Sequence, residues 1–134
     1  MKKLLIVLSV LTLNGCAVYD AYFMAKYDTN EYALVNDVTT KSFLAQKDCK
    51  DFNKTVVNVK DIYEMSYKLA KFTSHIPRND DATKMSEKLL ALSEGTRDYY
   101  YNNLNVSEIY CTLKLKQINK SAEEIQAVLA RKPR

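Results

Sequence analysis

The chain has 134 residues, enough for one domain with a single modest core but not for two. Its formal net charge is +4, and its Lys and Arg residues are interspersed with Asp and Glu, so the charge pattern argues against a nucleic-acid partner. Glycine and proline are scarce, with two of each in the whole chain. Since tight hairpins usually need such residues, this composition argues against a β protein built on repeated turns and favours helices with few connections.

The N-terminal residues have the pattern of an export leader. A lysine pair at positions 2 and 3 precedes an apolar run over residues 4–13, which ends shortly before Cys16. A helix rises about 1.5 Å per residue, so this run is too short for a hydrocarbon core of about 30 Å. We therefore expect a signal segment and not a membrane-spanning helix.

The run ends in Leu13-Asn14-Gly15-Cys16, which resembles the lipobox of bacterial lipoproteins. The resemblance implies a signal peptide over residues 1–15, cleavage before Cys16, and a mature lipid-anchored domain over residues 16–134. In that family the cysteine sulfur takes a diacylglycerol and the new amino terminus is acylated, and two or more acyl chains hold a protein stably on a membrane. The alternatives are an ordinary cleaved secretory signal and an uncleaved short anchor.

The residue after the cysteine bears on the membrane that would carry the protein. In Gram-negative lipoproteins an Asp at this position commonly retains the protein at the inner membrane, so by resemblance Ala17 favours sorting to the outer membrane. The implied location is the periplasmic face of the outer membrane.

Beyond the leader, apolar residues recur at spacings of three and four, which is the helical period. The pattern predicts helices over about 20–47 and about 51–75, the second of them ended by Pro77. A third helix is expected to begin near Asp80 or Asp81, whose carboxylates suit a first turn.

The third segment has a less regular apolar stripe than the others. Gly95 lies within it and is expected to bend or end the helix. The stripe runs through Met85, Leu89, Leu92, Thr96 and Tyr99. It therefore predicts that Tyr99 faces the core.

The last segment has the most regular stripe. Asn105, which follows the stretch that breaks the third pattern, is predicted to cap this helix with its side chain. The stripe runs at spacings of four and three through Cys111, Leu115, Ile118, Ala122, Ile125 and Leu129, which favours one long helix over two. Four helices with short connections alternate in direction, so the predicted fold is all-α: a small antiparallel helical bundle of about four helices.

Two cysteines remain beyond Cys16, and an exported pair in an oxidising compartment usually forms a disulfide. Cys49 follows the first helix and Cys111 lies in the early turns of the fourth, so an antiparallel bundle brings both to one end. We expect a disulfide between them that ties the bundle. Two free buried thiols or a reactive thiol are the alternatives, but the only histidine, His75, is expected at the opposite end.

Residues that usually carry catalysis are nearly absent. The sequence has one histidine, no Cys-x-x-Cys, no His-Glu-x-x-His and no Gly-rich phosphate loop, so we predict no metal site and no cofactor. The adjacent carboxylates Asp80-Asp81 and Glu123-Glu124 are typical of helix-start charges. We therefore expect that the protein is not an enzyme.

Three consecutive tyrosines, Tyr99, Tyr100 and Tyr101, are the most unusual local feature. On a helix they cover about 300° of arc, so at least one ring is expected to be exposed. With Tyr99 assigned to the core, Tyr100 and Tyr101 become a candidate partner-binding pair, because aromatic residues are favoured interface anchors. The alternative is that both rings lean on neighbouring side chains and bind nothing.

Together these features predict a membrane-anchored envelope lipoprotein that acts as a structural or protein-interaction module. Its expected partners are membrane lipid, through acylated Cys16, and an envelope protein, with no role for nucleic acid. Two alternatives remain open. One is a phage- or plasmid-encoded lipoprotein, of the outer-spanin or superinfection-exclusion kind. The other is a helical carrier of a small ligand, or an enzyme, with a cavity in the bundle.

Overall fold

A computed structural model describes residues 24–134 of the chain. The expected signal peptide, residues 1–15, and the expected lipidation site, Cys16, lie outside the described residues. Among residues 24–134, no helix combines the length and the apolar character that crossing a bilayer requires.

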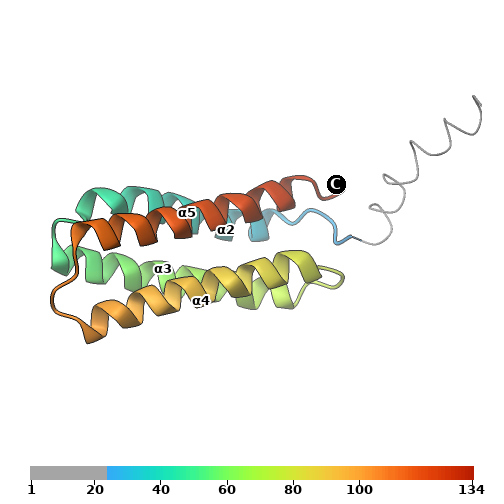
Figure 1. The fold of residues 1–134 in the computed structure, drawn as a ribbon. Coiled ribbons are helices and arrows are strands. Elements are labelled where there is room, and N and C mark those ends of the chain that lie inside the picture. Colours follow the sequence, from blue (N-terminus) through green and yellow to red (C-terminus); the bar gives the residue numbers. More distant parts are fainter. Residues whose placement is uncertain (1–23) are drawn as a thin grey trace, which may run out of the picture.

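The described chain consists of four long helices joined by short connections, and it contains no strand between residues 24 and 134. Helix α2 pairs most closely with α5, and α3 pairs most closely with α4 (Figure 1). The predicted all-α bundle is confirmed. The elements are α2 (Thr29–Ala45), the 3-10 helix η1 (Gln46–Asp48), α3 (Phe52–Ser74), α4 (Asp80–Asn102) and α5 (Glu108–Ala130).

Side-chain caps explain where three of the helices begin. Asp28 accepts hydrogen bonds from the backbone N–H groups of Asn30 and Glu31, at 2.8 and 3.0 Å, and so starts α2. Asp51 caps α3 in the same way. The prediction that Asn105 caps the last helix was wrong: the helix begins two residues later, with Ser107 as its cap.

Helices α4 and α5 are both continuous over 23 residues. Helix α4 begins at Asp80 as predicted, but Gly95 does not end it, because α4 continues to Asn102. Helix α5 is continuous from Glu108 to Ala130, which confirms the prediction of one long helix.

The bundle has two ends, and different segments of the chain form each of them (Figure 1). The disulfide end contains residues 46–51 and the connection 103–107. The terminal end contains residues 24–28, the α3–α4 turn and the C-terminal residues 131–134. Two backbone hydrogen bonds fasten the start of the described chain there: the Ala25 N–H donates to the Arg78 carbonyl at 3.1 Å, and the Tyr27 N–H donates to the Pro133 carbonyl at 2.9 Å.

The core follows the predicted stripe throughout α5 but only at Leu89 and Thr96 in α4. All six stripe residues of α5 are buried. In α4 the buried positions are Ala82, Ser86, Leu89, Ser93, Thr96 and Tyr100. Since one residue along a helix turns a side chain by about 100°, Tyr100 and not Tyr99 faces the core.

Hydroxyl side chains in the α3–α4 interface explain this difference in register. Ser66 and Ser93 are fully buried, and their hydroxyl oxygens lie 2.9 Å apart. Each oxygen is also 2.8 Å from the carbonyl oxygen four residues earlier in its own helix. Such residues can be buried because the helix backbone satisfies their hydroxyls, but they add nothing to an apolar stripe.

Candidate protein-contact surface

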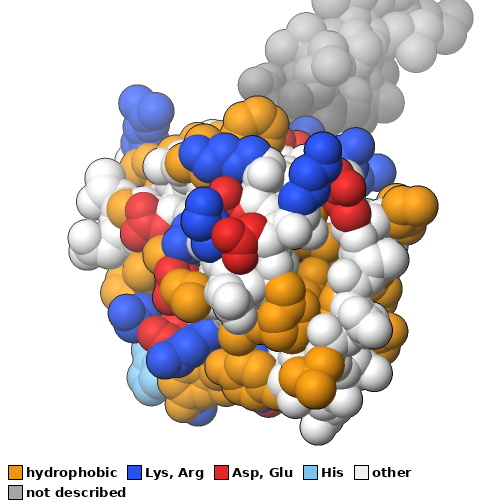
Figure 2. Space-filling view, turned by 90° about the vertical axis from the view of Figure 1, so that its left-hand side faces the viewer, with side chains coloured by type: hydrophobic (Ala, Val, Ile, Leu, Met, Phe, Trp, Pro, Cys, Tyr) orange, Lys and Arg blue, Asp and Glu red, His pale blue; other side chains and the backbone are white. Residues whose placement is uncertain are grey.

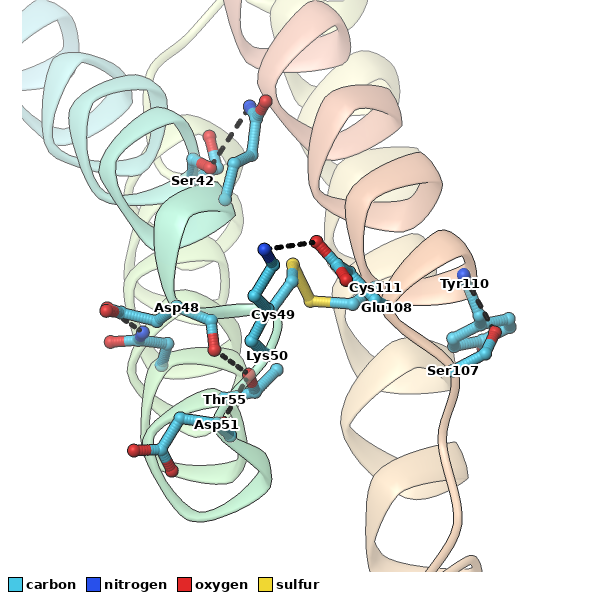
Figure 3. The surroundings of a disulfide bond; sticks show 12 residues. Ser42, Asp48, Cys49, Lys50, Asp51, Thr55, Ser107, Glu108, Tyr110 and Cys111 are labelled. Atoms are coloured by element: carbon cyan, nitrogen blue, oxygen red, sulfur yellow. Dashed lines mark hydrogen bonds and ion pairs between the residues drawn. A yellow bond between two sulfur atoms is a disulfide. The ribbon is translucent and has the colours of Figure 1, made fainter.

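The predicted disulfide is present at one end of the bundle. Cys49 and Cys111 are bonded, with their Cα atoms 5.6 Å apart and a sequence separation of 62. Figure 3 shows Lys50 and Glu108 facing each other beside this bond, with Nζ and Oε1 4.0 Å apart. Both side chains are exposed, so their ion pair adds little to stability. His75 follows α3 at the opposite end, as predicted.

An aromatic cluster packs behind the disulfide. The ring of Tyr100 lies 5.8 Å from Phe52 and 6.4 Å from Tyr110, between ring centroids, and Tyr99 stacks on Tyr110 at 4.3 Å. Burial, together with the neighbouring Tyr110 and Tyr99, raises the pKa of Tyr100 to about 12. Burial and Tyr99 also raise the pKa of Tyr110. The neutral phenols are therefore part of the packed interior of this end.

The tyrosine prediction needs correction. Only 3% of Tyr100 is exposed, so it belongs to the core and cannot serve as an exposed anchor. Tyr101 is 53% exposed, as expected of a surface residue, and Tyr99, which was assigned to the core, is also exposed. The candidate pair is thus reduced to Tyr101.

Exposed hydrophobic side chains gather at the disulfide end. Counting tyrosine, nine large hydrophobic residues are exposed among residues 24–134, and eight of them lie in the half of the bundle nearer the disulfide. We call these eight the apolar collar: Phe43, Leu44, Val57, Tyr99, Tyr101, Leu104, Ile109 and Leu113. In the end-on view hydrophobic side chains gather toward the lower right, whereas many of the charged ones lie toward the top and left (Figure 2).

The most exposed part of the collar lies where α4 passes into α5. Leu104 in the connection is 88% exposed, and Ile109 in the first turn of α5 is 73% exposed. One turn further along, Leu113 is also exposed, and together with Glu108 and Thr112 the two α5 residues line a shallow hollow of about 250 Å³. These side chains point away from the core, because the buried stripe of α5 runs along its other face.

Sequence reasoning missed most of the collar, although a signal was present. Ile109 and Leu113 are one helical turn apart and lie off the stripe that begins at Cys111. Phe43 and Leu44 similarly flank the buried Ser42 and Ala45 of α2. A hydrophobic residue that falls outside a regular stripe is expected on the surface, and several such residues near the same helix ends indicate a surface patch.

The terminal end contains a buried polar network that the sequence did not reveal. Lys132 Nζ lies 2.6 Å from Glu31 Oε2 and 2.5 Å from Asn79 Oδ1. The Asn79 amide in turn donates to Glu31 Oε1 at 2.6 Å and to the Thr73 carbonyl at 3.2 Å. Glu31 is completely buried and Lys132 is 5% exposed. Each charge has partners, and the network fastens the C-terminal residues to the bundle.

No cluster of side chains in the described part of the chain suggests catalysis by a metal. Among residues 24–134 there is no group of three or more His, Cys, Asp or Glu residues that could hold a metal ion. The two cysteines in that range, Cys49 and Cys111, are bonded to each other through their sulfur atoms. The apolar collar is therefore the best-developed candidate site.

Comparison with known proteins adds no relative. No protein-family model matches the chain, and searches of curated proteins and of solved structures also return no match.

Proposed function

We propose that the protein is a lipid-anchored envelope module that acts through protein contact and not through catalysis. Its anchor would be Cys16, cleaved and acylated as the lipobox resemblance implies. Its contact surface would be the apolar collar at the disulfide end. The proposed location is the periplasmic face of the outer membrane, and the proposed partner is an envelope protein with a complementary apolar surface.

The distribution of exposed hydrophobic residues carries this proposal. Eight of the nine lie in one half of the bundle, although all four helices run through both halves. Single exposed hydrophobic residues are ordinary, but a concentration of them at one end is typical of an interaction surface. Desolvation of such side chains drives association without any polar chemistry.

The described chain begins at the terminal end of the bundle, and this supports a contact surface far from the membrane. Met24 and Ala25 enter at the terminal end, next to the C-terminal residues. Helix α3 has 23 residues, and at about 1.5 Å per residue it separates the two ends by roughly 35 Å. A lipid on Cys16 would therefore hold the terminal end near the bilayer and present the apolar collar toward the periplasm.

Site-specific crosslinking in a producing bacterium tests the contact surface. A photoreactive amino acid at Ile109 is expected to give a discrete adduct with one envelope protein. The same amino acid at Gln117, which is exposed near the middle of α5, is the matched control and is expected to give none. The substitutions Leu104→Ser and Leu113→Ser should together reduce the Ile109 adduct by about tenfold or more, since anchor side chains contribute on the order of 2 kcal/mol.

Two results would contradict the contact surface. One is an Ile109 adduct that survives the serine substitutions unchanged, and the other is equal labelling from Gln117. Because Leu104 and Leu113 are exposed, their replacement should leave the circular dichroism and melting temperature close to those of the parent. That measurement separates loss of contact from loss of fold.

Metabolic labelling tests the anchor. The parent chain should take up labelled palmitate and lose its leader, and the Cys16→Ser variant should do neither by the lipoprotein pathway. A parent chain without label would disprove the anchor but leave the crosslinking result standing, so the two parts of the proposal can fail separately.

A further inference from the structure

The ninth exposed hydrophobic residue, Tyr67, stands apart from the apolar collar. It lies in the half of α3 nearer the terminal end and is exposed there. It borders an open groove of about 480 Å³, lined by Leu34, Tyr67, Lys68, Lys71, Phe72 and His75. The groove therefore combines an apolar floor, from Leu34 and two aromatic rings, with a basic rim.

The basic rim is not neutralised by the protein. Lys68 and Lys71 take part in no ion pair with a carboxylate of the described chain, and no acidic residue of that part lines the groove. The ammonium of Lys71 lies 5.7 Å from the centre of the Tyr67 ring, so it stays beside the apolar floor. Two cations beside an apolar surface fit an anionic amphiphile better than a neutral solute or a protein.

The acids nearest to the groove are engaged elsewhere or lie beyond its lining. Glu31 is buried against Lys132, with Oε2 2.6 Å from Nζ. Glu64, one turn before Lys68, has Oε1 3.9 Å from Lys60 Nζ. Asp37, one turn beyond Leu34, does not line the groove. The local charge that a ligand would meet is therefore positive.

The groove also lies at the end that an anchor would bring to a membrane, and in this respect the inference rests on the proposed function. Met24 is eight residues after Cys16, so the intervening chain can extend at most about 29 Å. We propose that the groove binds an anionic phospholipid of the membrane that carries the anchor. Lys68 and Lys71 contact the lipid phosphate, and the floor of Leu34, Tyr67 and Phe72 covers the upper part of an acyl chain.

This binding would orient the bundle. A lipid anchor alone leaves a domain free to tilt, whereas a second attachment on α3 fixes which side of the terminal end faces the bilayer. Two attachments acting together hold a protein more firmly than either alone. The apolar collar would then point in a defined direction.

Photoactivatable lipids test the proposal directly. The full chain, purified in detergent, is reconstituted into phosphatidylcholine vesicles that contain a trace of photoactivatable phosphatidylglycerol or of photoactivatable phosphatidylcholine. Mass spectrometry after illumination should locate the phosphatidylglycerol adduct in the segment from Tyr67 to His75. Phosphatidylcholine should label this segment several-fold less.

Matched charge reversals show whether the groove lysines are responsible. Lys68→Glu with Lys71→Glu should reduce the phosphatidylglycerol adduct by at least about tenfold, since each lysine near an anionic surface has a substantial effect on binding. Lys116→Glu with Lys120→Glu makes the same charge change on exposed positions of α5 and should leave the adduct unchanged. Tyr67→Ser should weaken labelling while both lysines remain.

The proposal would be overturned by equal labelling by the two lipids, by equal loss in both pairs of lysine variants, or by an adduct confined to residues outside the groove. Complete displacement by soluble glycerol phosphate would also overturn it, because the ligand would then be a free phosphate and not a lipid. Palmitate labelling of the same preparation distinguishes this failure from failure of the anchor. A chain without palmitate that still binds phosphatidylglycerol through its groove lysines would disprove only the anchor.

Discussion

At the disulfide end the bundle is closed by a covalent bond next to packed aromatic rings, whereas at the terminal end it is closed by the buried network of Glu31, Asn79 and Lys132. The disulfide end also displays most of the exposed hydrophobic residues, and the terminal end displays a groove with a basic rim. The end that is cross-linked is thus the end that exposes apolar side chains to water.

The stability of the fold gives a physical reason why the disulfide and the exposed hydrophobic residues lie at the same end. Exposed hydrophobic residues gain nothing from folding until a partner covers them, so a surface of this kind has to be supported by other interactions. A disulfide supplies that support because it lowers the conformational entropy of the unfolded chain. A buried ion pair adds less net stability, because desolvation of both charges opposes their attraction. It does, however, specify how the C-terminal residues dock.

Removing the disulfide should have the largest effect. Reduction of Cys49–Cys111, or the double change to Ser, releases a loop of about 60 residues and should cost up to about 4 kcal/mol of unfolding free energy. For a domain of this size the melting temperature should fall by roughly 15 °C. Thermal denaturation followed by circular dichroism measures it. A shift of only a degree or two would mean that the aromatic cluster holds this end without the bond.

Breaking the terminal network should have the next largest effect. Lys132→Met leaves the buried carboxylate of Glu31 with only the Asn79 amide as a partner, so the unfolding free energy should fall by about 3 kcal/mol. Adding Glu31→Gln removes the stranded charge and should recover much of that loss. Urea denaturation provides the values.

An exposed basic residue next to this network serves as the control. Arg131→Met should change stability by no more than about 0.5 kcal/mol, since the residue before Lys132 is exposed. If the two methionine variants are equally stable, the buried network does not hold the terminal end.

Alkaline pH should weaken the disulfide end in particular. The pKa of Tyr100 is raised by burial to about 12 from an ordinary value of 10.0, so the folded protein disfavours the phenolate. The stabilisation is complete below pH 10.0 and is lost as the pH rises from there through about 12. A difference of that size corresponds to about 2–3 kcal/mol.

The matching measurement is the urea midpoint of the parent and of Tyr100→Phe as the pH is raised above neutral. The parent should lose stability steeply above pH 10.0, and the variant should lose clearly less, because it has no phenol to ionise at that position. Identical pH profiles would show that Tyr100 does not control the alkaline stability of this end.

How far the sequence predicted the structure also differs between regions. The stripe of α5 was correct at all six positions because its core residues are apolar or cysteine. The disulfide was predicted correctly because the chain has one pair of cysteines beyond Cys16, and the alternating helix directions place Cys49 and Cys111 at the same end. In α4, by contrast, the core contains Ser86, Ser93 and Thr96. Hydrophobic periodicity does not detect these polar core residues, and it therefore predicted that Tyr99 is buried, one residue before the buried Tyr100.

The site was harder to predict than the fold. Tyr101 was the one residue of the collar proposed as a contact, and it was proposed with Tyr100, which is buried. The other collar residues are scattered through the sequence and share one half of the bundle only because the helices alternate in direction. The buried charges were missed for a different reason: Lys132 belongs to a basic tail, and such a tail is usually solvated.

The smallest effect is expected at Gly95, in the helix that joins the two ends. A Cβ added at Gly95 would meet no atom within 4 Å apart from its chain neighbours and the backbone of its own helix turn, and its neighbours in α4 are helical on both sides. Gly95→Ala should therefore stabilise the protein by about 0.5–1 kcal/mol, because alanine loses less backbone freedom than glycine when a helix forms. The gain should be the same with the disulfide intact or reduced, since α4 contains neither cysteine and the effects of sites without shared contacts add. Urea midpoints in both redox states measure this. A loss of stability would show that α4 needs a bend at Gly95, and a gain seen only with the disulfide intact would show that the two ends are coupled through α4.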